Sequence, residues 1–76
     1  MAGQPIHINR HRYETEAEEL TGHEILRLAG LGDDHDLFEL QGEGDRTGGS
    51  PIGLDQTIRI RPGMHFRAIP SNRNFG

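Results

Sequence analysis

Residues 20–31, with the sequence Leu-Thr-Gly-His-Glu-Ile-Leu-Arg-Leu-Ala-Gly-Leu, form the one stretch of this chain that reads unambiguously as a helix. Thr21 and Glu24 have the spacing of a capping box, in which each side chain bonds the other residue's backbone N–H. Gly30 can take the left-handed conformation that closes a helix. About two turns are too short to be stable alone, so the apolar side must pack on other elements. That side comprises Ile25, Leu28 and Ala29, with Leu26 beside it.

The segments before this helix predict a hairpin. Residues 5–10 alternate, with Ile6 and Ile8 on one face, which is typical of a half-buried strand. A tight turn at residues 9–11 leads into residues 11–16, where Tyr13 and Thr15 favour extended structure. The first two elements are therefore expected to be antiparallel strands.

Three further strands are expected after the helix. In residues 37–40, Glu39 is expected to face water, which would turn Phe38 and Leu40 inward and Leu37 outward. Residues 41–53 contain five glycines and predict a long loop. Residues 57–60 and 64–69 predict the last two strands, and the latter has Met64, Phe66 and Ala68 on one face.

The order of these elements predicts an α+β fold of the β-grasp type: one mixed sheet with one short helix packed on one face. The strand after the helix is expected to pair beside the first strand. Ile25 and Leu28 should then pack against four residues of the sheet, namely Ile6, Ile8, Phe38 and Phe66. Residues 1–70 would form the domain, and residues 71–76, which lack any periodicity, would form a loose tail.

The composition limits the classes of function. Seventy-six residues make one small domain, and the formal net charge of −4 disfavours a nucleic-acid partner. Cysteine is absent, so neither a disulfide nor a thiol nucleophile is available. The sequence has neither a signal region nor a stretch of membrane-spanning length, which predicts a cytoplasmic protein without a membrane partner.

The spacing of the histidines does not match a metal-binding motif, and the sequence offers no recognisable set of catalytic residues. His7 and His11 flank the expected turn rather than share a helix face. His23-Glu24 begins a metalloprotease motif, but Arg27 stands where the second histidine ligand belongs. Neither a Ser–His–Asp set nor a pair of carboxylates falls on rigid elements, so we do not expect an enzyme.

Three segments, residues 20–31, 36–40 and 60–70, resemble the ubiquitin-like proteins of bacteria, and more narrowly the multiubiquitin type. The resemblance implies a protein modifier whose terminal carboxylate is adenylated and then joined to a target protein. It implies an activating enzyme, a conjugating enzyme and a zinc metallopeptidase as partners, and a role in antiviral defence. The modifier itself needs no cofactor, because the activating enzyme uses the ATP.

The same resemblance assigns candidate site residues. Gly76 would be the attachment residue, since glycine removes the Cβ that would crowd an adenylating site. The tail residues Ser71, Asn72, Arg73, Asn74 and Phe75 would extend into a groove of a partner. By strand alternation, Leu37 and Ile69 are expected to point away from the helix, and with Arg67 they would form a partner-binding patch on the outer sheet face. The chain departs from the usual pattern by ending in one glycine rather than two, and a sulfur carrier and a non-conjugated interaction module remain alternatives.

Lysine is absent, and all eight basic residues are arginines. Arginine stays protonated and cannot serve as an amine nucleophile. The α-amino group at the N-terminus is therefore the one amine that could accept a second copy. Through amide bonds, the sequence predicts attachment as single copies, or at most head-to-tail chains through the N-terminus. Only attack by a hydroxyl, on Ser50 or Ser71 for instance, could branch such a chain, and hydroxylamine would cleave the resulting esters.

Overall fold

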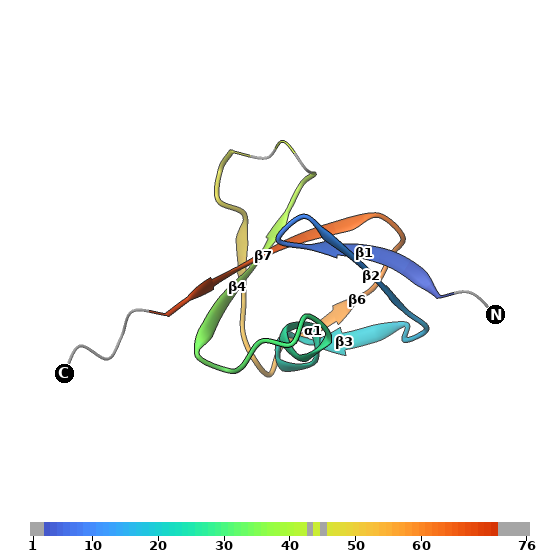
Figure 1. Cartoon of the computed structure of the whole chain (residues 1–76), viewed down its shortest axis with the longest axis horizontal. Helices are drawn as coiled ribbons and strands as arrows, with labels where there is room; N and C mark the ends of the chain where they lie inside the picture. The colour runs from blue at the N-terminus through green and yellow to red at the C-terminus, as the bar shows by residue number, and fades with distance from the viewer. Residues whose placement is uncertain (1–2, 43, 45, 72–76) are drawn as a thin grey trace.

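The computed structural model describes residues 3–42, 44 and 46–71, and these form seven strands and one helix. Their bounds are β1 Gln4–Ile8, β2 His11–Thr15, β3 Glu19–Thr21, α1 Gly22–Leu28, β4 His35–Leu40, β5 Ser50–Ile52, β6 Thr57–Arg59 and β7 Met64–Pro70. Five strands form a mixed sheet in the order β2-β1-β7-β4-β5, and α1 lies on one side of it (Figure 1). This arrangement confirms the expected α+β, β-grasp fold.

The last strand, β7, lies at the centre of the sheet. It pairs in parallel with β1, with Ile6 opposite Met64, and antiparallel with β4 from His35 to Leu40. The expectation that the strand after the helix pairs beside the first strand was wrong, because β7 occupies that place. The first strand, β1, thus pairs with the last strand, β7, at the centre of the sheet, and both edges of β7 are paired.

The β1–β2 hairpin turns at Asn9 and Arg10, whose φ angles are 54° and 71°. Two successive left-handed residues match a type I′ turn, which suits the twist of a hairpin. The Asn9 Nδ2 donates to the carbonyl oxygen of Ala68 at 3.0 Å, and its Oδ1 accepts from the Ala68 N–H at 2.9 Å. The Asn9 side chain therefore continues the pairing with β7 beyond the end of β1.

The ends of α1 are closed as the sequence predicted. Thr21 Oγ1 accepts from the Glu24 N–H at 3.2 Å, and Glu24 Oε1 accepts from the Thr21 N–H at 2.9 Å, which completes the capping box. Gly30 has a φ of 75°, and the Leu31 N–H donates to the carbonyl of Leu26 at 2.9 Å. This bond returns the chain over the last turn of the helix.

The register of β4 is opposite to the one expected. Leu37 is only 2% exposed and belongs to the core, whereas Phe38 and Leu40 lie on the other face and are partly buried. Leu37 lies between Ala68 of β7 and Ile52 of β5, and both neighbours are buried. Glu39 shares the face of Leu37 and yet stays partly exposed, so its charge did not determine the register.

The helix is also rotated relative to the expectation. Ile25 and Leu26 are both 0% exposed, while Leu28 and Ala29 are partly buried at the margin of the core. Leu28 packs against the core as predicted, but it is only partly buried, and Leu26 is the fully buried helix residue beside Ile25. The buried apolar core comprises Ile6, Ile8, Ile25, Leu26, Leu37, Ile52, Ile60, Phe66 and Ala68.

Two features of the architecture had no counterpart in the sequence prediction. β3 and β6 form a separate two-stranded antiparallel sheet beside α1, so the strands do not all belong to one sheet. β5 lies inside the expected long loop and pairs with β4.

Among the described residues, no helix has the length and apolar character needed to cross a membrane.

Candidate functional site

The face of the five-stranded sheet that points away from α1 carries apolar side chains and charges of both signs, since Asp36 lies on it opposite Ile69. In the register of β4 and β7, Phe38 lies opposite Arg67. Ile69 follows Arg67 by two residues in β7 and therefore lies on the same face. We call Phe38, Arg67 and Ile69 the outer patch. Arg67 is exposed, while Phe38 and Ile69 are partly buried. Of the three residues expected there, Arg67 and Ile69 lie on this face, whereas Leu37 is buried and Phe38 stands in its place.

A histidine pair extends this face toward β1. His7 and His65 are opposite each other in the parallel register, and their rings stack with centroids 4.5 Å apart and planes 10° from parallel. The sequence had suggested comparing His7 with His11, but His11 pairs with Ile8 on the other face. Only the pairing of β1 with β7 could have revealed the stack, and the sequence alone does not give that pairing.

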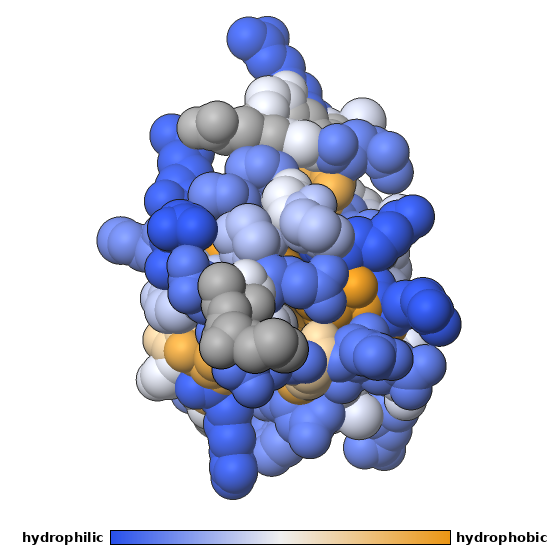
Figure 2. Space-filling model, turned by 90° about the vertical axis from the view of Figure 1, so that its right-hand side faces the viewer, coloured by the Kyte–Doolittle hydropathy of each residue, from blue (hydrophilic) through white to orange (hydrophobic). Residues whose placement is uncertain are grey.

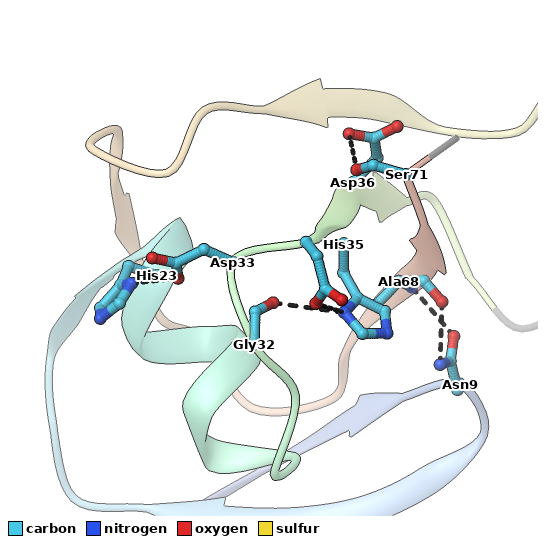
Figure 3. Close-up of polar contacts among 9 residues, drawn as sticks. Asn9, His23, Gly32, Asp33, His35, Asp36, Ala68 and Ser71 are labelled. Carbon is cyan, nitrogen blue, oxygen red and sulfur yellow. Dashed lines mark hydrogen bonds and ion pairs between the residues drawn. The ribbon is translucent and has the colours of Figure 1, made fainter. Parts of the chain in front are cut away.

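The chain leaves the sheet at a fixed point beside the start of β4. The Ser71 N–H donates to the carbonyl of Asp34 at 2.8 Å, and the Ser71 hydroxyl donates to Asp36 Oδ1 at 2.9 Å (Figure 3). Ser71, which was assigned to a loose tail, is therefore tied to β4. Residues 72–76, including the expected attachment residue Gly76, lie outside the described residues.

Polar contacts also order the segment between α1 and β4. His35 Nδ1 lies 2.9 Å from the carboxylate of Asp34 and 3.2 Å from the carbonyl of Gly32. His23 Nδ1 bonds the carboxylate of Asp33, which joins the start of α1 to this segment (Figure 3). Within residues 3–42, 44 and 46–71, no three histidine, cysteine or acidic side chains are grouped as metal ligands would be.

The side of the molecule near the described N-terminal residues is mostly hydrophilic. Figure 2 shows this side, on which apolar residues appear only as small separate areas between polar ones. An exposed salt bridge of 3.0 Å joins Arg12 and Glu14 of β2, and such surface pairs contribute little to stability. The face visible in Figure 2 therefore shows no continuous apolar area of the kind that docks a protein partner.

A mixed β-grasp sheet, one short helix on its face and a C-terminal strand at its centre define a ubiquitin-like domain. The family model described as Multiubiquitin matches residues 5–71, and the chain therefore belongs to the Multiubiquitin family. No curated protein and no solved structure gives a significant match. Ubiquitin-like domains are generally small non-catalytic modifiers or interaction modules.

Proposed function

We propose that this protein is a ubiquitin-like modifier that is adenylated by an activating enzyme and conjugated to target proteins through Gly76. The main support is the anchored exit of the chain at Ser71, which lies beside β4 at the end of the central strand. The family membership and the terminal glycine agree with this proposal. Under this proposal the protein acts in the cytoplasm, where ATP is available to the activating enzyme.

The distance from Ser71 to the end of the chain suits entry into an enzyme's active site. Five residues separate Ser71 from the carboxylate of Gly76. A fully extended chain spans about 3.3–3.6 Å per residue, so the carboxylate can reach roughly 17 Å beyond the domain. Because Gly76 has no Cβ, the backbone can approach the nucleotide and the attacking group closely.

The outer patch is the proposed contact with the activating and conjugating enzymes. It combines two apolar side chains with the exposed guanidinium of Arg67, and two of its three residues lie on β7, the strand that leads to the exit at Ser71. An acidic and apolar surface would complement it. A zinc metallopeptidase that cleaves the bond after Gly76 would complete the cycle by releasing the modifier from its target.

Reconstitution with the cognate activating and conjugating enzymes tests the proposal. We expect wild-type protein to support ATP–pyrophosphate exchange and to form conjugates whose mass identifies a bond from Gly76. Deletion of Gly76 should abolish both reactions, while the circular dichroism spectrum stays unchanged. The matched control is Gly42→Ala, which alters a glycine whose added Cβ would meet no atom within 4 Å, and it should conjugate normally.

The same experiment separates the alternatives. A sulfur carrier would be adenylated but would accumulate as a thiocarboxylate, which adds 16 Da when sulfur replaces oxygen, instead of forming protein conjugates. A non-conjugated interaction module would be indifferent to the deletion of Gly76. Conjugation by the truncated protein at the wild-type rate would refute attachment through Gly76.

A further inference from the structure

A groove lies between the start of β4 and the segment that connects β5 to β6. It has a volume of about 640 Å³ and is lined by residues 33, 35–38 and 51–56. We call it the β4 groove. In Figure 3 this connecting segment runs above the ribbon that carries Asp33, His35 and Asp36, and it then descends toward α1. Pockets of such volume are large enough to hold side chains of a bound ligand.

The polar lining of the β4 groove is acidic. Asp33, Asp36 and Asp55 line it together with His35 and Gln56, whereas no arginine does. Asp33 bonds His23, and Asp36 accepts from the Ser71 hydroxyl, so these two carboxylates are held in place. Asp55 is exposed to solvent. Field lines from carboxylates in a concave site reinforce one another, so the groove favours a cationic ligand and repels phosphate.

The remaining lining is largely apolar. Leu54 is 37% exposed and is the one exposed large hydrophobic residue in the described part of the chain. Phe38, Pro51 and the edges of Leu37 and Ile52 extend this apolar surface along β4 and β5. A ligand for this groove therefore needs an apolar part beside its positive charge.

Hydrogen bonds to α1 hold one wall of the groove, the segment 53–56 between β5 and β6, in position. The Gly22 N–H donates to the carbonyl of Gln56 at 3.1 Å, and the His23 N–H donates to the carbonyl of Leu54 at 3.0 Å. The Gly53 N–H donates to Gln56 Oε1 at 3.0 Å, which closes the turn between them. Because the first backbone donors of the helix are satisfied by this wall, the groove is formed before any ligand arrives, and binding loses less entropy.

We propose that the β4 groove binds a peptide segment of a partner protein that carries an arginine next to an apolar side chain. The guanidinium would lie beside the exposed carboxylate of Asp55, and the apolar side chain would pack on Leu54. Arginine fits better than lysine because its planar fork can bind both oxygens of one carboxylate and is more weakly hydrated. A divalent cation is a poorer fit, since the described carboxylates are not grouped as metal ligands. The proposal does not depend on conjugation through Gly76.

Titration of the ¹⁵N-labelled full chain with a synthetic peptide tests this inference. The probe has one arginine followed by leucine, with glycines on both sides and blocked ends. We expect amide shifts confined to residues 33–38 and 51–56, together with weaker binding at higher salt because the contact is ionic. Replacing the arginine by citrulline, which keeps the shape and removes the charge, should weaken binding about tenfold or more.

Two variants with the same change of charge provide the control. Asp55→Asn removes a carboxylate from the groove, whereas Glu16→Gln removes an exposed one between β2 and β3. Asp55→Asn should reduce the affinity for the peptide at least about threefold, and Glu16→Gln should leave it unchanged. Equal binding of the citrulline peptide, equal effects of the two variants, or shifts that extend to Arg67 and Ile69 would overturn the proposal. If the groove amides shift with protein concentration in the absence of peptide, the groove binds a second copy of this chain rather than a partner protein, and the proposal is wrong.

Discussion

Gly22, the first residue of α1, is a position where one added methyl group should destabilise the domain. A Cβ there would lie well within 3.0 Å of the carbonyl oxygen of Gly53, and real Cβ contacts essentially never fall below that distance. In Gly22→Ala, α1 and the segment 53–56 must therefore separate. That movement strains the two bonds from Gly22 and His23 to this segment. Each such bond contributes about 0.5–1.5 kcal/mol, and buried donors left unpaired cost about 1–3 kcal/mol.

Helix propensity acts in the opposite direction, because alanine is favoured over glycine by about 1 kcal/mol. We expect a net loss of about 2 kcal/mol in the free energy of unfolding, which lowers the Tm of a domain this small by roughly 8–16 °C. Thermal and urea unfolding monitored by circular dichroism measure it. The control is Gly42→Ala, whose added Cβ meets no atom within 4 Å, and its change should stay within about 0.5 kcal/mol. A Gly22→Ala protein as stable as the wild type would refute the close approach of the helix and this segment.

Two further predictions concern the register of β4 and the absence of lysine. Leu37→Asp should unfold the domain or cost more than about 3 kcal/mol, because it places a carboxylate in the core, whereas Phe38→Asp should largely preserve the Tm and weaken binding to the activating enzyme. Equal stability of the two variants in urea unfolding would show that the register is wrong. Conjugates made with the cognate enzymes should contain single copies, or head-to-tail chains through the N-terminus. A hydroxylamine-resistant bond from Gly76 to an internal residue of a second copy, found by mass spectrometry, would contradict this expectation.

Local signals in the sequence predicted the elements that depend on neighbouring residues. The capping box of Thr21 and Glu24, the left-handed Gly30 and the turn at Asn9 all form through contacts within a few positions. The alternation in β7 predicted its inner face because Phe66 and Ala68 leave no competing arrangement. The fold class then followed from the order of these elements.

The errors arose where a partner distant in sequence decides the outcome. Residues 37–40 hold three apolar side chains around Glu39, so alternation allows two registers. Burial of Leu37 between Ala68 and Ile52 selects one of them, and neither neighbour is visible from the local pattern. The three-residue strands β3 and β5 are too short for a periodic signal and exist through their pairing. The β4 groove depends on the same distant contacts, which is why the sequence did not suggest it.

The parallel pairing of β1 with β7 also has a consequence for how the chain acquires its structure during synthesis. Residues 6–8 are made early, yet their partners at residues 64–66 follow near the end of this sequence. Closing so long a loop is slow, and non-local contacts of this kind lower folding rates. The hairpin and the capped helix can form while the chain is still emerging from the ribosome, but the sheet has no centre until β7 arrives. A ribosome-bound chain that stops before residue 64 should therefore be digested by proteases that leave the finished domain intact.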